Sequence, residues 1–153
     1  MRVSAKTDYA LRAAVELAAA AGDGTPVKGE RLATSQSIPL RFLENILLQM
    51  RHAGLIESRR GADGGYKLAR PPEEITLADV IRAIDGPLAG VSGQRPETLD
   101  FKGTSEPLRE VWVAVRASLR SVLEQVTLAD VAAGELPASV RALTESPDAW
   151  VSH

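Results

Sequence analysis

The 153-residue sequence predicts a mostly α-helical chain: a winged helix-turn-helix domain with a small β-hairpin wing, followed by a long C-terminal dimerisation helix. Three observations support this prediction. Two short helical patterns, over 29–35 and 40–52, are separated by a tight turn. Two strand-like segments follow them around a glycine-rich tip. A long apolar stripe with helical spacing begins near residue 106.

The first two helices are predicted from the residues at their ends and from their apolar faces. Ser4 or Thr7 is the expected N-cap of a first helix, which ends at Gly22-Asp23-Gly24. Alanine and leucine recur on one face of this helix, and the short alanine side chains allow close packing. A second, shorter helix is predicted over 29–35.

A tight turn at Ser37-Ile38-Pro39 leads into a third helix over 40–52, with Pro39 near its start. Ala33 is small at the point where the two helices must cross closely, and Ile38 fills the turn. One face of the third helix is apolar at three- and four-residue spacing, which leaves the other face to solvent or to a partner.

Two short strands are predicted after this helix, over 55–59 and 65–69. The glycine-rich segment 60–64 between them forms the tip of a hairpin. Arg59 and Arg60 place two guanidinium groups at this thin end. An ordinary surface hairpin could contain the same two arginines, so its position directly after a helix-turn-helix is what favours a role in DNA binding.

The second half of the chain is predicted to be helical around one long loop. A fourth helix is expected over 77–84, and residues 86–107 are expected to form a loop of uncertain order. A long helix over 106–125 and a short one over 128–133 follow. We divide the chain into a winged helix-turn-helix domain (1–72), a connecting helix and effector loop (73–105), dimerisation helices (106–133) and a partly mobile C-terminal tail (134–153).

Composition limits the chemistry of the chain. It contains no cysteine and only two histidines, which excludes disulfides, thiolate metal sites and cysteine-ligated iron–sulfur clusters. We find no glycine-rich phosphate-binding loop, no nucleophile–base pair and no metal-binding constellation, so we predict neither an enzyme nor a metal site. No apolar segment is long enough to cross a bilayer and no signal peptide is recognisable, so we expect a cytoplasmic protein with no membrane partner.

Charge is distributed unevenly along the chain, whose net charge is −2. Residues 1–70 contain 11 basic and 7 acidic side chains, whereas residues 71–153 contain 7 basic and 13 acidic ones. A basic half joined to an acidic half suggests a polyanion-binding surface beside a separate regulatory or assembly half. Chance clustering of solvated charges would give the same pattern, so charge has to be combined with the motifs.

The motif itself indicates how DNA would be bound. In a winged helix-turn-helix, the start of the third helix meets base edges in the major groove, and an arginine at a thin hairpin tip can enter the minor groove. Arginine can pair with guanine, asparagine or glutamine with adenine, and glutamate with cytosine, while phenylalanine can contact a thymine methyl group. An ordinary amphipathic helix with a polar solvent face is the alternative interpretation.

The long helix is predicted to form a homodimer. Burial of about eight apolar side chains at roughly 2 kcal/mol each would contribute on the order of 15 kcal/mol before entropy costs. A homodimer requires a roughly palindromic DNA site with recognition helices about 34 Å apart. A helix that packs only within its own subunit is the alternative. The stripe, at alternating three- and four-residue steps, consists of Leu108, Val111, Trp112, Val115, Leu119, Val122, Leu123 and Val126.

Seven segments share their residues and spacing with one known family: 1–12, 38–44, 53–56, 60–70, 75–81, 111–112 and 127–130. These segments resemble the IscR/NsrR-type (Rrf-two) bacterial transcription regulators, in register over about residues 1–133. The resemblance implies a homodimeric winged-helix protein that binds double-stranded DNA and acts mainly as a repressor. A winged-helix module that responds to a protein partner and reads no operator is the alternative function.

The resemblance also implies roles for single residues. Ser4 and Lys6 would contact phosphates, and Arg60 would enter the minor groove. Arg59 is an additional cation that we assign to phosphates. The residues that fall where the family reads the major groove are Arg41, Phe42, Glu44 and Asn45. The complete set of DNA-binding candidates is Ser4, Lys6, Lys28, Arg41, Phe42, Glu44, Asn45, Gln49, Arg51, Arg59, Arg60, Gly61, Gly64, Gly65, Tyr66 and Lys67.

One segment departs from the family. Many members have three cysteines between the fourth helix and the long helix, and these hold an iron–sulfur cluster. The corresponding loop, 88–100, has neither cysteine nor histidine, so we expect no cluster and no other cofactor. Asp8 falls where some members supply a non-cysteine ligand, but helix electrostatics explain it more simply. The signal would come from a small-molecule effector near the loop, from a protein effector as in the cluster-free CymR branch, or be absent.

Overall fold

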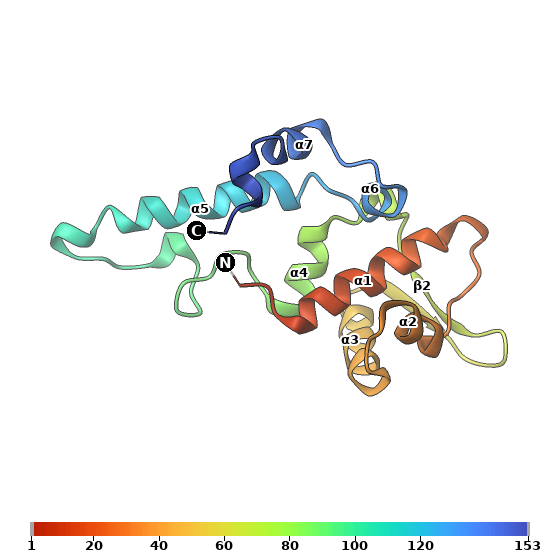
Figure 1. Cartoon of the computed structure of the whole chain (residues 1–153). Coiled ribbons are helices and arrows are strands. Elements are labelled where there is room, and N and C mark those ends of the chain that lie inside the picture. Colours follow the sequence, from red (N-terminus) through yellow and green to blue (C-terminus); the bar gives the residue numbers. More distant parts are fainter. Residues whose placement is uncertain (1, 153) are drawn as a thin grey trace.

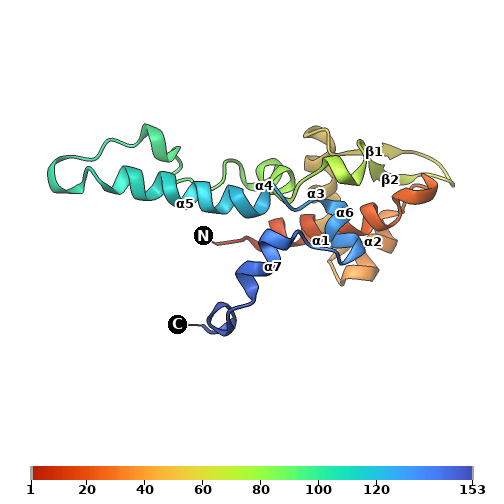
Figure 2. The same ribbon diagram turned by 90° about the horizontal axis from the view of Figure 1, so that it is seen from above.

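The chain folds around its first helix, and one long helix extends away from the packed end of the molecule (Figure 1, Figure 2). The computed structural model describes residues 2–152, so Met1 and His153, at the ends of the first and last predicted segments, lie outside it. The helices are α1 (Ala5–Ala19), α2 (Gly29–Gln36), α3 (Leu40–His52), α4 (Leu77–Asp85), α5 (Leu108–Leu123), α6 (Leu128–Ala133) and α7 (Ala138–Thr144), and the strands are β1 (Ile56–Arg59) and β2 (Gly65–Leu68).

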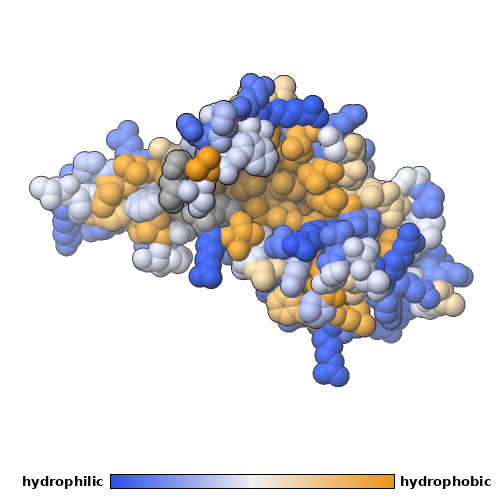
Figure 3. Space-filling model, viewed as in Figure 1, coloured by the Kyte–Doolittle hydropathy of each residue, from blue (hydrophilic) through white to orange (hydrophobic). Residues whose placement is uncertain are grey.

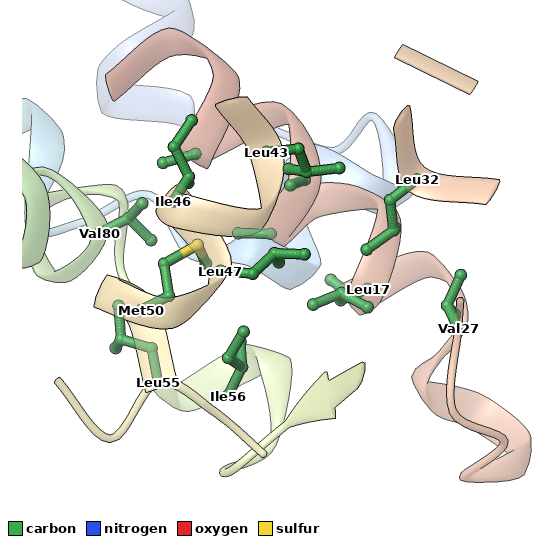
Figure 4. Close-up of a cluster of buried hydrophobic side chains, with 14 of the residues drawn as sticks. Leu17, Val27, Leu32, Leu43, Ile46, Leu47, Met50, Leu55, Ile56 and Val80 are labelled. Carbon is green, nitrogen blue, oxygen red and sulfur yellow. The ribbon is translucent and has the colours of Figure 1, made fainter. Parts of the chain in front are cut away.

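The core of the packed end lies between α1, α3 and the hairpin (Figure 4). Four of the five residues predicted for the apolar face of α3 are fully buried, Leu43, Ile46, Leu47 and Met50, whereas Leu40 at the start of the helix is 37% exposed. Leu17 of α1, Leu32 of α2 and Val80 of α4 belong to the same cluster. Because α1 contributes mainly alanines to this core, the helices around it can approach closely.

The start of α1 is fixed by Ser4, which decides between the two expected N-caps. The backbone N–H of Thr7 donates to the Ser4 Oγ at 3.1 Å, and Ser4 itself has an extended backbone. Thr7 is buried inside the first turn, and its hydroxyl donates to the carboxylate of Asp85 at 2.5 Å. Asp85 is the last residue of α4, so this contact ties the start of α1 to the end of α4.

The turn between α2 and α3 depends on one residue in the left-handed region. Ser37 has φ = 54°, and it ends α2 one residue later than predicted. The N–H of the next residue, Ile38, donates to the carbonyl of Ala33 at 2.9 Å, and the Ile38 side chain is buried. The helix-turn-helix predicted from this segment is therefore present, and α3 has the predicted bounds.

The hairpin is antiparallel, with Glu57 opposite Lys67 and Arg59 opposite Gly65. Each strand is one residue shorter than predicted. A residue before α2 extends the sheet: the N–H of Val27 donates to the carbonyl of Tyr66, and the N–H of Tyr66 to the carbonyl of Val27, both at 2.8 Å. A single paired residue cannot show the alternation of apolar and polar side chains that identifies a strand, so the sequence could not reveal this bridge.

The segments that contain the starts of α4 and α6 are nearly identical, and they pair with each other. Residues 75–80 read Ile-Thr-Leu-Ala-Asp-Val, and residues 126–131 read Val-Thr-Leu-Ala-Asp-Val. In each copy the threonine and the aspartate form a capping box at the helix start. The two copies are joined by antiparallel backbone bonds, from the N–H of Leu77 to Val126 and from the N–H of Leu128 to Ile75. This pairing attaches the end of α5 to the packed end of the chain.

The remaining segments differ from the prediction in detail. The loop after α4 contains two 3₁₀ turns, Pro96–Thr98 and Gly103–Ser105, and α5 is shorter at both ends than the predicted 106–125. No helix was predicted in the tail, yet α7 and a 3₁₀ turn over Pro147–Trp150 are present. Neither element buries a residue, so they leave no apolar pattern in the sequence. Within residues 2–152, no helix combines the length and the apolar character needed to cross a membrane.

Candidate nucleic-acid interface

We call β1, β2 and the connecting segment 60–64 the wing. The wing and α3 lie at the same end of the molecule, opposite the far end of α5 (Figure 1). The guanidinium group of Arg51, in the last turn of α3, donates to the hydroxyl of Ser58 in β1 at 3.0 Å. In the space-filling view, hydrophilic side chains project from this end of the chain between apolar ones (Figure 3). The fold therefore brings α3 and the wing together, with Arg51 linking them.

The start of α3 presents three polar side chains to solvent: Arg41, Glu44 and Asn45. Phe42 is 43% exposed, and its ring packs edge-on against Tyr9 of α1, with 5.8 Å between ring centres. Arg12 in turn lies 5.7 Å from the centre of the Tyr9 ring. Tyr9 and Arg12 are not among the predicted site residues, although both fall in segment 1–12 and contact the exposed Phe42 directly or through Tyr9.

The wing tip exposes Arg59 and Arg60. In the part of the chain that the structure describes, none of the ion pairs involves Arg41, Arg59 or Arg60. Lys67 is different, because its ammonium group lies 3.5 Å from the carboxylate of Glu57 on the opposite strand. Three guanidinium groups at this end thus remain available to an anionic partner.

The wing glycines serve the hairpin itself. A Cβ atom on Gly64 would lie 2.2 Å from the carbonyl oxygen of Arg59, and one on Gly65 would lie 2.6 Å from the carbonyl oxygen of Val27. Gly65 also has φ = +146°, which side chains disfavour. Gly64 is buried, so it is unable to contact DNA as predicted. Gly61, by contrast, is exposed at the tip with φ = +104°.

Other candidates are partly occupied by contacts within the chain. Tyr66 is half-buried beside Gly29 at the start of α2, and Gln49 is half-buried with its side-chain Nε2 3.5 Å from the side-chain Oδ1 of Asn45. The Ser4 hydroxyl lies 3.1 Å from a carboxylate oxygen of Asp85. A phosphate at Ser4 would therefore lie near a negative charge. Of the two remaining lysine candidates, Lys28 is exposed and Lys6 is half-buried.

The apolar stripe of α5 is not covered within the described chain. Leu108, Val111 and Val115 are 38–50% exposed, and no residue of α5 is buried. The half-buried members are Trp112, Leu119, Val122 and Leu123. Val126 is the exception: it is 3% exposed and lies beyond the helix, in the paired segment beside α4. Its assignment to the dimer stripe was wrong, because its own subunit already buries it.

A cavity of about 450 Å³ lies where α5, the start of α1 and the loop after α4 meet. Its polar lining includes Arg2, Asp85 and Arg95, and its apolar lining includes Trp112 and Leu119. Within residues 2–152, no group of three or more histidine, cysteine, aspartate or glutamate residues could hold a metal ion.

These features can be compared with those of known proteins. A family model described as "Rrf2: Iron-dependent Transcriptional regulator" matches residues 3–134. The chain belongs to the Rrf2 family. Its membership confirms the resemblance inferred from the sequence, the winged-helix fold and the class of DNA-binding helix-turn-helix transcriptional regulators.

The Rrf2 relatives include proteins of distant bacteria. The chain is 53% identical to Rv1287 of Mycobacterium tuberculosis H37Rv, whose name classes it with helix-turn-helix transcriptional regulators; the match covers 95% of this chain and 89% of that one. It is 36% identical to the regulator CymR of Bacillus subtilis over 86% of this chain and 90% of that one. The solved structure of B. subtilis CymR, "the Global Cysteine Regulator", has a TM-score of 0.74, 34% identity, and covers 88% of this chain and 98% of its own. The solved structure of T. potens IscR has a TM-score of 0.67 and 33% identity, and the match covers 100% of this chain and 93% of that one.

The description of the Rrf2 family names iron, so we compare the possible metal ligands of this chain with those that an iron–sulfur cluster requires. The chain has no cysteine to supply thiolates. Asp85 is the carboxylate in the cavity lining, and it already accepts hydrogen bonds from Ser4 and Thr7. These residues do not fit an iron–sulfur cluster, which requires thiolate or imidazole ligands.

Proposed function

We propose that the protein is a homodimeric transcriptional repressor that binds a palindromic operator and does so without an iron–sulfur cluster. The observation that supports this proposal most strongly is the joint exposure of Arg41 at the start of α3 and of Arg59 and Arg60 at the wing tip, with no ion pair to any of them in residues 2–152. A function on chromosomal DNA implies a cytoplasmic location.

Each part of this end has a distinct proposed role. Arg41, Glu44 and Asn45 read base edges in the major groove, because they stand at the exposed start of α3. Arg60 enters the minor groove, and Arg59 binds phosphates. Phe42 is oriented by its contact with Tyr9, so its free edge can reach a thymine methyl group.

The proposed homodimer forms through the exposed stripe of α5. Side chains such as Val111 and Val115 have no other cover in the described part of the chain, and a second copy of the same stripe provides one. A two-fold axis through this contact presents two copies of α3 and the wing to DNA. The operator would then contain two related half-sites, separated by about one turn of the double helix, or 34 Å.

The test begins with genome-wide recovery of DNA bound to the protein, followed by fluorescence anisotropy on the recovered sites. Affinity should fall with salt by about 0.9 log unit per log unit for each phosphate contact. Arg60→Ala should weaken operator binding by about 1–3 kcal/mol, most at A·T-rich minor-groove steps. Arg141→Ala removes the same charge from α7, which lies apart from the wing and α3, and should have no such effect.

Two results would contradict the proposal. One is a folded dimer that retains no DNA in recovery and gives no anisotropy change at low salt. The other is equal operator affinity of Arg60→Ala and the unmodified protein. Either would favour a winged-helix module that binds a protein partner instead.

A further inference from the structure

A second depression lies beside the cavity described above, between the end of α4 and α5. Its volume is about 440 Å³, within the range of small-molecule sites. Four arginines and one carboxylate line it: Arg82, Arg95, Arg116, Arg120 and Glu97. We call it the arginine groove. This concentration of guanidinium groups lies in the half of the chain that is acidic in composition.

The carboxylates near the groove neutralise only part of this charge. Arg116 pairs with Glu97, and Arg82 and Arg120 both pair with Glu124. Four guanidinium groups thus face three carboxylates, because Asp79 also lies 3.9 Å from Arg82 while its other oxygen accepts the backbone N–H of Thr76. Arg95 takes part in none of the ion pairs among residues 2–152 and carries the charge left over.

Both glutamates remain ionised near neutral pH. The pKa of Glu124 is lowered, mainly by its hydrogen bonds from Arg82 and Arg120. The pKa of Glu97 is lowered by a hydrogen bond from its own backbone and then by Arg116. Each carboxylate is engaged by arginine, so the positive charge in excess of these pairs is the part that a ligand can use.

The position of the groove keeps it apart from the proposed dimer contact. Arg116 and Arg120 are one helical turn apart and follow stripe residues Val115 and Leu119 by one position, which places them about 100° around α5. The neighbouring 450 Å³ cavity, by contrast, is walled by Trp112, Val115 and Leu119 of the stripe itself. A second subunit on the stripe would restrict that cavity, whose lining shares Arg95 with the arginine groove, whereas Arg116 and Arg120 lie beside the stripe rather than on it.

We propose that the arginine groove binds a small anion with two or more negative charges, held by Arg95 and Arg116 together with Arg82 or Arg120. The planar, fork-shaped guanidinium group binds phosphate and carboxylate oxygens in pairs, so phosphate compounds and polycarboxylates share the required chemistry. DNA is not the favoured ligand, because the groove lies between α4 and α5 rather than at the end that contains the wing.

Such a ligand would connect the two regions of the molecule. Arg82 belongs to α4, which packs on the DNA-binding domain, whereas Arg116 and Arg120 belong to α5. The Arg82–Glu124 pair already joins the two helices, and an anion between the arginines would strengthen or replace that link. This regulatory part rests on the proposed function, but binding of the anion does not.

Titration calorimetry on the full-length dimer tests the binding, with pyrophosphate, inorganic phosphate and citrate as probes at constant ionic strength. We expect saturable binding of pyrophosphate or citrate at one site per chain, and the comparison between them tells phosphate from carboxylate recognition. Arg95→Gln should lower the affinity about tenfold, and the Arg95→Gln/Arg116→Gln double variant should lower it further. Arg141→Gln removes a charge outside the groove and should leave the affinity unchanged. Because Arg95 is in no ion pair of the described chain, its variant should keep the native circular dichroism spectrum.

Three results would overturn the site: no saturation by any probe up to about 10 mM, equal affinity of Arg95→Gln and the unmodified protein, or an equal loss in Arg141→Gln. Operator affinity with and without the anion then tests the regulatory part, and a change of several-fold is expected. Calorimetric binding with no change in operator affinity would overturn the regulatory part alone. Calorimetric binding by a dimer that binds no DNA at all would refute the proposed function and leave the site intact.

Discussion

α3 and α5 are both amphipathic, with apolar residues at the same three- and four-residue spacing, but the structure treats them differently. The apolar face of α3 is buried against α1, α4 and the hairpin at every predicted position except Leu40. The apolar face of α5 contains no buried residue. The pattern therefore shows that a helix needs an apolar partner surface without showing whether that surface is in the same chain. The packed end buries most of its own apolar residues, whereas the stripe of α5 stays partly exposed in the described chain.

The sharpest way to test this contrast is to truncate two adjacent leucines of α3. Leu47→Ala should lower the free energy of unfolding by about 2–5 kcal/mol, since it leaves a cavity in a core where Leu47 is 0% exposed. Leu48→Ala, on the neighbouring position that is 42% exposed, should change it by no more than about 0.5 kcal/mol. Urea unfolding monitored by circular dichroism measures both. Equal losses would show that the packed end is not the self-contained unit described above.

A charge placed on α5 tests the other side of the contrast. Val115→Asp should convert the dimer to monomers, because a second stripe cannot bury a carboxylate without a partner. It should reduce operator affinity by about 100-fold, since two linked half-sites gain 10²–10⁴ over one. Ala117→Asp, about half a turn around the helix from Val115, is the matched control. Sedimentation at several concentrations gives the oligomeric state, and a monomeric unmodified protein would contradict the role of the stripe.

The smallest expected effect concerns the turn of the helix-turn-helix. Ser37→Gly should stabilise the protein by about 0.5–1 kcal/mol. Glycine removes the steric strain of a side chain at φ = 54°, and this gain exceeds the extra chain entropy that glycine loses on folding. Ser35→Gly, inside α2, should destabilise it by a similar amount. The two shifts should be independent of protein concentration, unlike that of Val115→Asp. Thermal unfolding at two concentrations makes the comparison, and a lower melting temperature for Ser37→Gly would refute it.

How well the sequence predicted an element depended on how many residues marked it. The bounds of α3 were correct, because Pro39 precedes the helix, Ala53-Gly54 follows it, and a periodic apolar face lies between. Val27 was missed, since a single paired residue has no period. The helix α7 was missed because its residues pack on nothing that would select apolar side chains.

The candidate site was predicted from motifs, and the contacts within it needed coordinates. The exposure of Arg41 and Arg60 follows from their places at a helix start and a hairpin tip. Gly64 is buried, and a Cβ atom there would lie 2.2 Å from the carbonyl oxygen of Arg59, a constraint from the backbone that the side-chain pattern does not encode. The excess of arginine between α4 and α5 was hidden in the sequence, because residues 82 and 120 meet only after the intervening loop has closed.

The backbone pairing of residues 75–77 with residues 126–128 joins the start of α4 to the segment that follows α5. The loop and α5 lie between these segments, so the chain leaves the packed end after α4 and returns to it at this pairing. The loop and α5 can then vary in length, or acquire different ligands, without disturbing how the helix-turn-helix is built. A change in the loop or in α5 would then alter the proposed anion site and leave the DNA-binding domain as it is.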